Sequence, residues 1–407
     1  MTVLNLDQHK KVPPNFSLFN LGFRPFFLGA GVLAMLSMLI WYLLLQGTLS
    51  LADSSLSIVL WHTHQMIFGF SMAIVTGFLL TAVKNWTNID TPSGRPLFLL
   101  FSLWLGARIG WLLLPFIPEM TQTLLVISAV LDLAFNLYFA LAFARPIFLS
   151  KQWNQIGLLV KVVLMGILNL LFYLGLFGVL EQGTTWGIYG GFFIILAIIL
   201  TMARRVIPFF IERGVDEKVS LKNPKWIDHS SLVLFLLLAI SEVFLNTPLL
   251  TALFASALVV VGGIRLFNWH TAGIWQKSML WSLYLGMVAI QIGFLLFALT
   301  FFFPPLQSLA IHTLAVGAIG LITLGMMTRV TLGHTGRNVN QPPRFHTFLL
   351  TLILIATVIR VLFPMLWPEH YSSWISFSQL FWIGAYGVFV ITFAPMLIQK
   401  RIDGHFG

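Results

Sequence analysis

The chain has 407 residues, of which 58% are hydrophobic and only 9% are charged, and its net charge is +10. Because about a quarter of the residues in soluble proteins are charged, this composition excludes an ordinary soluble domain. The positive charge does not indicate nucleic-acid binding, since most of the Lys and Arg residues stand at the ends of apolar runs, where they face anionic lipid. The absence of cysteine excludes disulfides, thiolate metal ligands, iron–sulfur clusters and covalent c-type haem.

Twelve apolar runs follow one another along the chain, each of roughly the 17–25 residues that a helix needs to cross a bilayer. A helix satisfies all its backbone hydrogen bonds internally, which lipid demands. The sequence therefore predicts an all-α fold, a polytopic membrane helical bundle of about twelve transmembrane helices that forms a single integral membrane domain over 1–407. We expect the helices at 26–45, 61–83, 96–114, 120–143, 157–180, 186–207, 230–246, 249–267, 278–303, 306–328, 346–366 and 373–398.

The gaps between these runs alternate in charge. Every odd-numbered gap lacks Lys and Arg, whereas every even-numbered gap is basic, and Lys10, Lys11, Lys400 and Arg401 flank the bundle. This positive-inside pattern predicts that both termini are cytoplasmic and that the number of spans is even. The longest polar stretch, 212–229, would be a cytoplasmic loop that joins two potential halves, 1–211 and 230–407.

Four charged residues stand out within the predicted spans: Arg108, Asp132, Glu242 and Arg360. Charges at membrane depth are costly and usually functional. One interpretation is structural, with ion pairs such as Arg108 with Asp132 or Arg360 with Glu242. The other is that the arginines bind an anionic group, such as haem propionates or an anionic substrate, while Asp132 and Glu242 act as catalytic groups that carry protons.

Three histidines are predicted at the outer ends of their helices: His62 and His64 in the second span and His312 in the tenth. If these two helices are neighbours, three imidazoles converge at one depth, which favours a metal site in a chain without cysteine. Residues two apart on a helix point about 200° apart, so His62 and His64 cannot both bind one metal within a single helix. If both are functional, they serve different sites, or one is a ligand while the other holds a neighbouring group of the site in place.

A second cluster is predicted at the inner end of the tenth span. His334 lies between Arg329 and Arg337, in a stretch where Gly333 and Gly336 allow tight turns. One interpretation is ordinary basic anchoring. The alternative is that these three side chains bind a cofactor, with His334 as a ligand or proton carrier beside a quinol headgroup or a pair of propionates.

Several motifs together resemble the NnrS family, in order and over almost the whole chain. They lie at 23–27 (FRPFF), 61–70 (WHTHQMIFGF), 76–86 (TGFLLTAVKNW), 204–210 (RRVIPFF) and 312–337, which includes the specific segment TRVTLGHTGR at 328–337. The resemblance implies a bacterial inner-membrane protein of about twelve spans. It also implies haem and copper binding and a role in nitric oxide metabolism or resistance to nitrosative stress.

Two positions depart from the family pattern. Gln65 stands where relatives carry Glu, and Tyr284 stands where they often carry His. Gln and Tyr are weaker or less common metal ligands, so these positions bear on which cofactors the chain holds.

The leading hypothesis is a membrane protein that binds non-covalent b-type haem, and copper as a further expectation, and acts on nitric oxide. Its enzymatic form would reduce nitric oxide with electrons from quinol. The alternatives are a proton-coupled secondary transporter of a small anion and a factor that delivers haem or copper to respiratory complexes. The expected surroundings are the lipid bilayer, with no nucleic acid, and the oligomeric state stays open.

Overall fold

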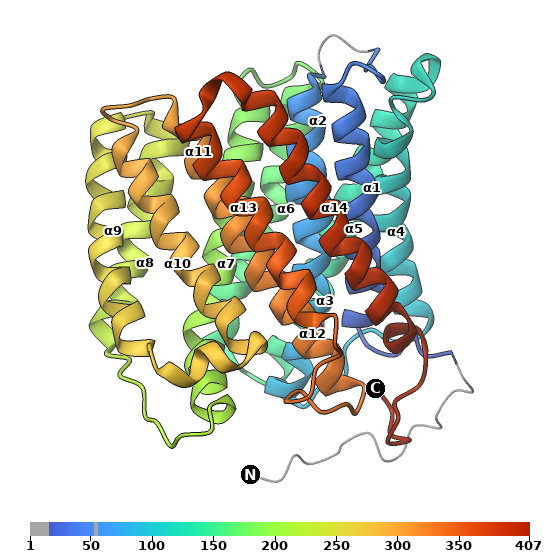
Figure 1. Ribbon diagram of the computed structural model, residues 1–407. Helices are drawn as coiled ribbons and strands as arrows, with labels where there is room; N and C mark the ends of the chain where they lie inside the picture. Colours follow the sequence, from blue (N-terminus) through green and yellow to red (C-terminus); the bar gives the residue numbers. More distant parts are fainter. Residues whose placement is uncertain (1–15, 53–55) are drawn as a thin grey trace. The chain divides into compact units, whose positions relative to one another are not determined.

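A computed structural model describes residues 16–52 and 56–407, so the predicted anchors Lys10 and Lys11 lie outside the described residues. Within the described residues every regular element is a helix (Figure 1). Twelve of the helical stretches are long and apolar enough to cross a membrane. The predicted all-α, multi-pass membrane fold is therefore confirmed. An even number of spans fits the charge pattern, while the side on which the termini lie stays a prediction.

The chain packs into two compact units. The described part of the first falls within Met1–Ile195, Met327–Val339 and Tyr386–Gly407, and the second comprises Leu196–Met326 and Asn340–Ala385. Whether 1–211 and 230–407 form two halves stays a prediction. The elements that belong to the first unit alone are α1 (Phe23–Leu45), α2 (Ile58–His64), η1 (Gln65–Ser71), α3 (Met72–Thr87), α4 (Arg95–Leu113), η2 (Pro118–Met120), α5 (Thr121–Leu149), η3 (Trp153–Gln155) and α6 (Ile156–Leu176).

Three further helices contribute residues to both units: α7 (Gly183–Gly214), α12 (Leu321–His334) and α14 (Tyr371–Ile398). The elements of the second unit alone are α8 (Lys225–Ile240), η4 (Ser241–Leu245), α9 (Pro248–Trp269), η5 (Ala272–Gln276), α10 (Ser278–Leu299), α11 (Leu306–His312), η6 (Thr313–Gly320), α13 (His346–Leu366) and η7 (Pro368–His370).

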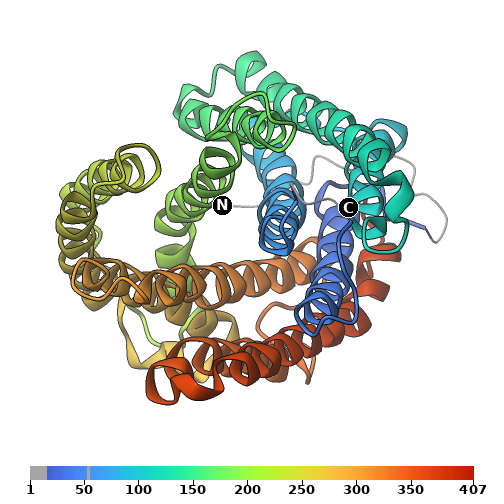
Figure 2. The same cartoon turned by 90° about the horizontal axis from the view of Figure 1, so that it is seen from above.

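Several consecutive spans pack against one another within each unit, as short connections favour. In the first unit α4 lies beside α5, and α5 beside α6. In the second unit α8 lies beside α9, and α9 beside α10; the yellow-green pair α8 and α9 is clear in both views (Figures 1 and 2). Small residues permit the closest approaches: a Cβ atom on Gly110 of α4 would stand 2.1 Å from the Ser128 hydroxyl of α5.

The helix bounds agree with the predicted ones to within a few residues at most ends, but three helices run further. α5 continues to Leu149 and α7 to Gly214, in both cases past an internal proline, and α12 continues to His334. These extensions carry polar and basic residues that the apolar pattern cannot mark as helical, because outside lipid a helix needs no apolar surface. Gly333 is therefore helical, whereas Gly336 has φ +78° and makes the predicted turn.

Three spans contain a π-helical segment: η1, η4 and η6. π-Helical turns are rare and frequently lie at functional sites. Each one here adjoins or contains a residue that the sequence singles out. η1 directly follows His64, η6 directly follows His312, and η4 contains Glu242.

Candidate functional site

The last turn of α2 places His62 and His64 on opposite sides of one short helix. Ser57 caps the helix, because its hydroxyl accepts a hydrogen bond from the Leu60 backbone N–H at 3.1 Å. The His62 ring stacks on Trp41 with centroids 4.5 Å apart, whereas the His64 ring is fully buried and stacks on Trp111 at 4.1 Å. The two imidazoles thus have different neighbours, which confirms the predicted divergence.

The π-helical segment η1 brings α4 close to His64. Gly69 in this segment leaves room for Arg108, since a Cβ atom there would stand 3.0 Å from the arginine's Nη1 atom. The Gly69 carbonyl also accepts a hydrogen bond from the Trp104 indole N–H at 3.0 Å. Altered pairing along a π-helical turn changes which carbonyls face neighbouring side chains, and here one of them anchors α4.

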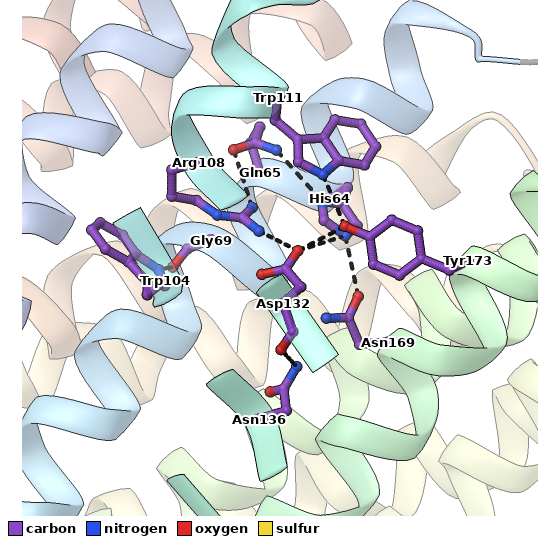
Figure 3. A network of polar contacts seen from close by, with 10 residues as sticks. All are labelled: His64, Gln65, Gly69, Trp104, Arg108, Trp111, Asp132, Asn136, Asn169 and Tyr173. Carbon is purple, nitrogen blue, oxygen red and sulfur yellow. Dashed lines mark hydrogen bonds and ion pairs between the residues drawn. The ribbon is translucent and has the colours of Figure 1, made fainter. Parts of the chain in front are cut away.

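The carboxylate of Asp132 lies at the centre of a buried polar network in the first unit (Figure 3). Arg108 donates to Asp132 Oδ2 in a close ion pair, and the Tyr173 hydroxyl donates to the same oxygen at 2.7 Å. Trp111 in turn donates its indole N–H to the Tyr173 hydroxyl at 2.9 Å. The predicted pairing of Arg108 with Asp132 is therefore confirmed. Together with Tyr173, the pair links α4, α5 and α6.

His64 belongs to the same network through both ring nitrogens. Arg108 can only donate, so Gln65 must present its oxygen to the arginine (3.2 Å) and its amide nitrogen to His64 Nδ1 (3.4 Å). His64 Nδ1 then accepts, and Nε2 carries the proton and donates to Asn169 Oδ1 at 3.2 Å. Nε2 also lies 3.8 Å from Asp132 Oδ2. In this structure His64 is a hydrogen-bonded member of the network.

Several polar atoms of this network have no hydrogen-bond partner. They belong to side chains that are at most 5% exposed and include two acceptors and two donors. The acceptors are Asp132 Oδ1 and Asn136 Oδ1, and the donors are Arg108 Nε and Asn169 Nδ2. Buried polar groups are normally paired, often through internal water. These unpaired donors and acceptors suit small polar molecules that both donate and accept hydrogen bonds. Binding of such molecules is expected in a region that conducts protons.

In the second unit His312 lies beside Arg360. His312 Nδ1 is 2.7 Å from the Ser308 carbonyl, which can only accept, and 3.2 Å from Arg360 Nη2, which can only donate. The shorter contact assigns the proton to Nδ1, so Nε2 carries the lone pair. An imidazole that donates to a backbone carbonyl through one nitrogen is in the usual state of a metal-ligating histidine.

The second predicted ion pair, between Arg360 and Glu242, does not form among the described residues. Arg360 Nη2 donates instead to the Ser308 and Tyr371 hydroxyls at 3.3 and 3.4 Å. Glu242 accepts from Thr251 and Gln307, at 3.2 and 2.8 Å. The prediction was wrong because it weighed only the charges, whereas the π-helical segment η4 directs Glu242 to neutral partners on α9 and α11.

The predicted inner cluster contains a residue that the sequence reasoning passed over. Arg24 is fully buried, and its Nη1 atom donates to the carbonyls of Met396, Leu397 and Gln399 at the end of α14. The His334 ring packs against Phe23, with centroids 5.6 Å apart. The carbonyls of a helix C-terminus attract cations, which identifies Arg24 as a helix cap.

Outside the membrane spans at this end, two groups have shifted pKa values. Burial lowers the pKa of Arg337, and a hydrogen bond from Arg401 lowers the pKa of Asp403 to about 2. Arg329 is part of the same long helix α12 as His334. Binding of a quinol or of propionates by His334, Arg329 and Arg337 stays a prediction.

A metal ion held by side chains alone needs more protein ligands than a haem iron does. Within residues 16–52 and 56–407, no group of three or more His, Asp or Glu side chains is arranged to hold a metal ion. Haem iron needs only one or two axial ligands from the protein. His62 and His64 belong to the first unit and His312 to the second, so convergence of the three imidazoles stays a prediction.

Sequence reasoning missed Tyr173, Asn169 and Trp111, which hold Asp132 and His64 in place. These residue types are common in apolar spans and carry no charge to mark them. Asn169 offered one signal, since an amide deep in an apolar run must find a partner. Tyr284, which departs from the family pattern, donates its hydroxyl to the Leu266 carbonyl at 3.1 Å and lies 5.8 Å from the His270 ring.

Two comparisons with known proteins bear on identity. No curated protein matches the chain in sequence. A profile of the family described as NnrS protein matches residues 17–401, nearly the whole chain. The match covers every element described above, including both polar clusters. The chain therefore belongs to the NnrS family of multi-pass membrane proteins.

Proposed function

We propose that the protein binds b-type haem non-covalently in a bacterial inner membrane and acts in nitric oxide metabolism. Family membership supports the role, and one observation supports the haem ligand. His312 donates through Nδ1 to the Ser308 carbonyl, and in this tautomer Nε2 would be the atom that binds the iron. Bound haem would supply an iron atom that changes redox state and offers a position for a diatomic molecule.

The residues of the second unit fit such a group. His312 would provide the axial imidazole, and Arg360 would lie near the carboxylates of the cofactor, since it has no acidic partner among the described residues. Arg108 suits that role less well because Asp132 already neutralises it. For copper, which the family resemblance also implies, His62 offers an imidazole outside the network of His64.

In the enzymatic form, two nitric oxide molecules, two electrons and two protons would give nitrous oxide and water, with quinol as the electron donor. The network around Asp132 would carry protons. Asp132 Oδ1 and Asn136 Oδ1 have free acceptor capacity, and Arg108 Nε and Asn169 Nδ2 have free donor capacity. Glu242, hydrogen-bonded to Gln307 at the start of α11, would serve the second unit.

The test is a spectrum and a haem assay of the full chain, purified in detergent from haem-replete cells. We expect a Soret band in the wild type, a large loss of haem in His312→Ala, and an unchanged band in the control His229→Ala, whose exposed ring bonds the Lys225 carbonyl. Absence of a Soret band from the wild type would refute haem binding. Full haem content and an unchanged spectrum in His312→Ala would refute the ligand assignment.

The same preparation tests the other two candidates. His64→Ala should reduce stability without changing the haem spectrum, because His64 uses both nitrogens within the protein. Copper analysis of His62→Ala against wild type tests the copper assignment, and equal copper content would remove His62 from the site. Addition of nitric oxide to the reduced protein should shift the Soret band if iron offers an open position.

A further inference from the structure

Four arginines are buried in the membrane spans of the described residues, and one of them lacks the compensation that the others have. Arg24 donates to three carbonyls at the end of α14, Arg108 pairs with Asp132, and Arg265 pairs with Asp228 at 3.0 Å. Arg360, only 6% exposed, has neither a carboxylate nor a helix C-terminus as a partner among the described residues.

The contacts that Arg360 makes are weak for a buried cation. Its Nη2 atom lies 3.2–3.4 Å from Ser308, His312 and Tyr371, all neutral, and its Nη1 atom has no hydrogen-bond partner. None of the ion pairs among the described residues involves Arg360. A buried guanidinium without a counter-charge is strongly destabilising, so this arrangement requires a negative charge from outside the described chain.

We propose that Arg360, Ser308 and Tyr371 form a binding site for a single planar oxyanion with two adjacent oxygens, the geometry that a carboxylate and nitrite share. A guanidinium binds such an anion through two parallel N–H groups. Nη1, which has no hydrogen-bond partner, would supply one of them, and Nη2 would supply the other in place of one of its contacts at 3.2–3.4 Å. The Ser308 and Tyr371 hydroxyls, 3.5 Å apart, can rotate to donate to the anion as well. The guanidinium carbon lies 5.5 Å from the Tyr371 ring centroid, which holds the cation in place.

The site can be reached by a ligand because its three residues and the neighbouring His312 lie towards helix ends. Ser308 and His312 lie in α11, Arg360 lies near the end of α13, and Tyr371 begins α14. Tyr371 is 39% exposed, and Ser308 and His312 are partly exposed. Gly317 lets η6 approach α13 below the site, since a Cβ atom there would stand 2.9 Å from Thr357. The charge pattern predicts that this end faces away from the cytoplasm.

Two sources could supply the anion: a carboxylate of a bound haem, which rests on the function proposed above, or a free small oxyanion such as nitrite. The probes are sodium acetate and sodium nitrite, compared with sodium chloride at equal ionic strength. The readouts are the haem content of the full chain in detergent and its thermal unfolding midpoint. The variants are Arg360→Gln, Arg360→Lys and Tyr371→Phe, with Arg344→Gln, an exposed arginine of the second unit, as the control.

A cofactor carboxylate predicts that Arg360→Gln loses haem while Arg344→Gln keeps it. A free oxyanion predicts equal haem in both, with acetate or nitrite raising the unfolding midpoint of the wild type and of Arg344→Gln but not of Arg360→Gln. Loss of a hydrogen bond to a charged group corresponds to about tenfold weaker binding or more. Arg360→Lys should retain part of the effect, because it keeps the charge without the planar fork.

If Arg360→Gln does not fold, Tyr371→Phe tests the site instead. It removes one hydroxyl from the site and should weaken anion binding severalfold. The proposal is refuted if the variants at both positions keep wild-type haem content and respond to both anions as the wild type does. A wild-type protein without haem that acetate still stabilises through Arg360 would refute the haem function and support the oxyanion site.

Discussion

Replacing Asp132 by Asn should leave Arg108 as an uncompensated buried charge. Both side chains are at most 1% exposed, so solvent screens their interaction little. Breaking a buried ion pair by removing one partner costs about 3–5 kcal/mol, and we expect Asp132→Asn to lose that much unfolding free energy. In Arg108→Gln/Asp132→Asn both groups are neutral, and the remaining cost should be about 1–2 kcal/mol for imperfect hydrogen bonds.

The assay is chemical unfolding in detergent micelles, followed by tryptophan fluorescence, for the wild type, the two single variants and the double variant. The expected coupling energy is at least about 2 kcal/mol. The control cycle uses Arg401 and Asp403, whose side chains are 18% and 34% exposed, and it should give less than about 1 kcal/mol. If the effects of Arg108→Gln and Asp132→Asn simply add, the account of the network as a coupled ion pair is refuted.

Three further predictions concern local features. Gly110→Ala should cost about 1–3 kcal/mol of unfolding free energy by overpacking, since the new Cβ would stand 2.1 Å from the Ser128 hydroxyl. The control Gly157→Ala, with open space around it, should be neutral or stabilising. Equal unfolding midpoints for the two variants would contradict this. Ser57→Ala should remove the cap of α2 at a cost of about 1 kcal/mol, seen as faster amide exchange at Leu60, and Ser57→Thr should preserve it. The lowered pKa of Asp403, about 2 against 3.8, means that its contribution to stability is present above about pH 4 and is lost as the pH falls towards 2. Hydrogen exchange of the Ile402 amide, which bonds the Thr335 carbonyl, reports this effect. Its protection factor, corrected for the intrinsic exchange rate, should follow this pH profile in the wild type and not in Asp403→Asn.

The sequence predicts the spans well because the signal is simple. Lipid requires long apolar helices, and the cytoplasmic side attracts Lys and Arg, so run length and gap charge suffice. The ends of α7 and α12 extend beyond the prediction, since a helix that leaves the bilayer no longer needs apolar residues. The sequence could not predict the π-helical segments, because a one-residue change in hydrogen-bond register does not alter the pattern of apolar residues.

The candidate site was predicted in part. Arg108 and Asp132 could be paired because they occupy consecutive spans that a short connection makes neighbours. The pairing of Arg360 with Glu242 failed, since spans seven and eleven are far apart in the chain and nothing fixes their relative rotation. The opposite directions of His62 and His64 followed from helix geometry alone. The partners that each imidazole meets depend on packing, which a single sequence does not specify.

The two polar clusters contain the same residue types, an arginine, a histidine and a tyrosine, yet differ in what they leave unsatisfied. In the first unit the chain supplies Asp132 for Arg108 and occupies both nitrogens of His64. In the second, the contacts that the described residues make with Arg360 are all neutral. Since a buried charge must be neutralised, the first cluster is complete in charge, whereas in the second the proposed oxyanion would neutralise Arg360. The presence or absence of a charged partner therefore distinguishes the two clusters, which their residue types alone do not.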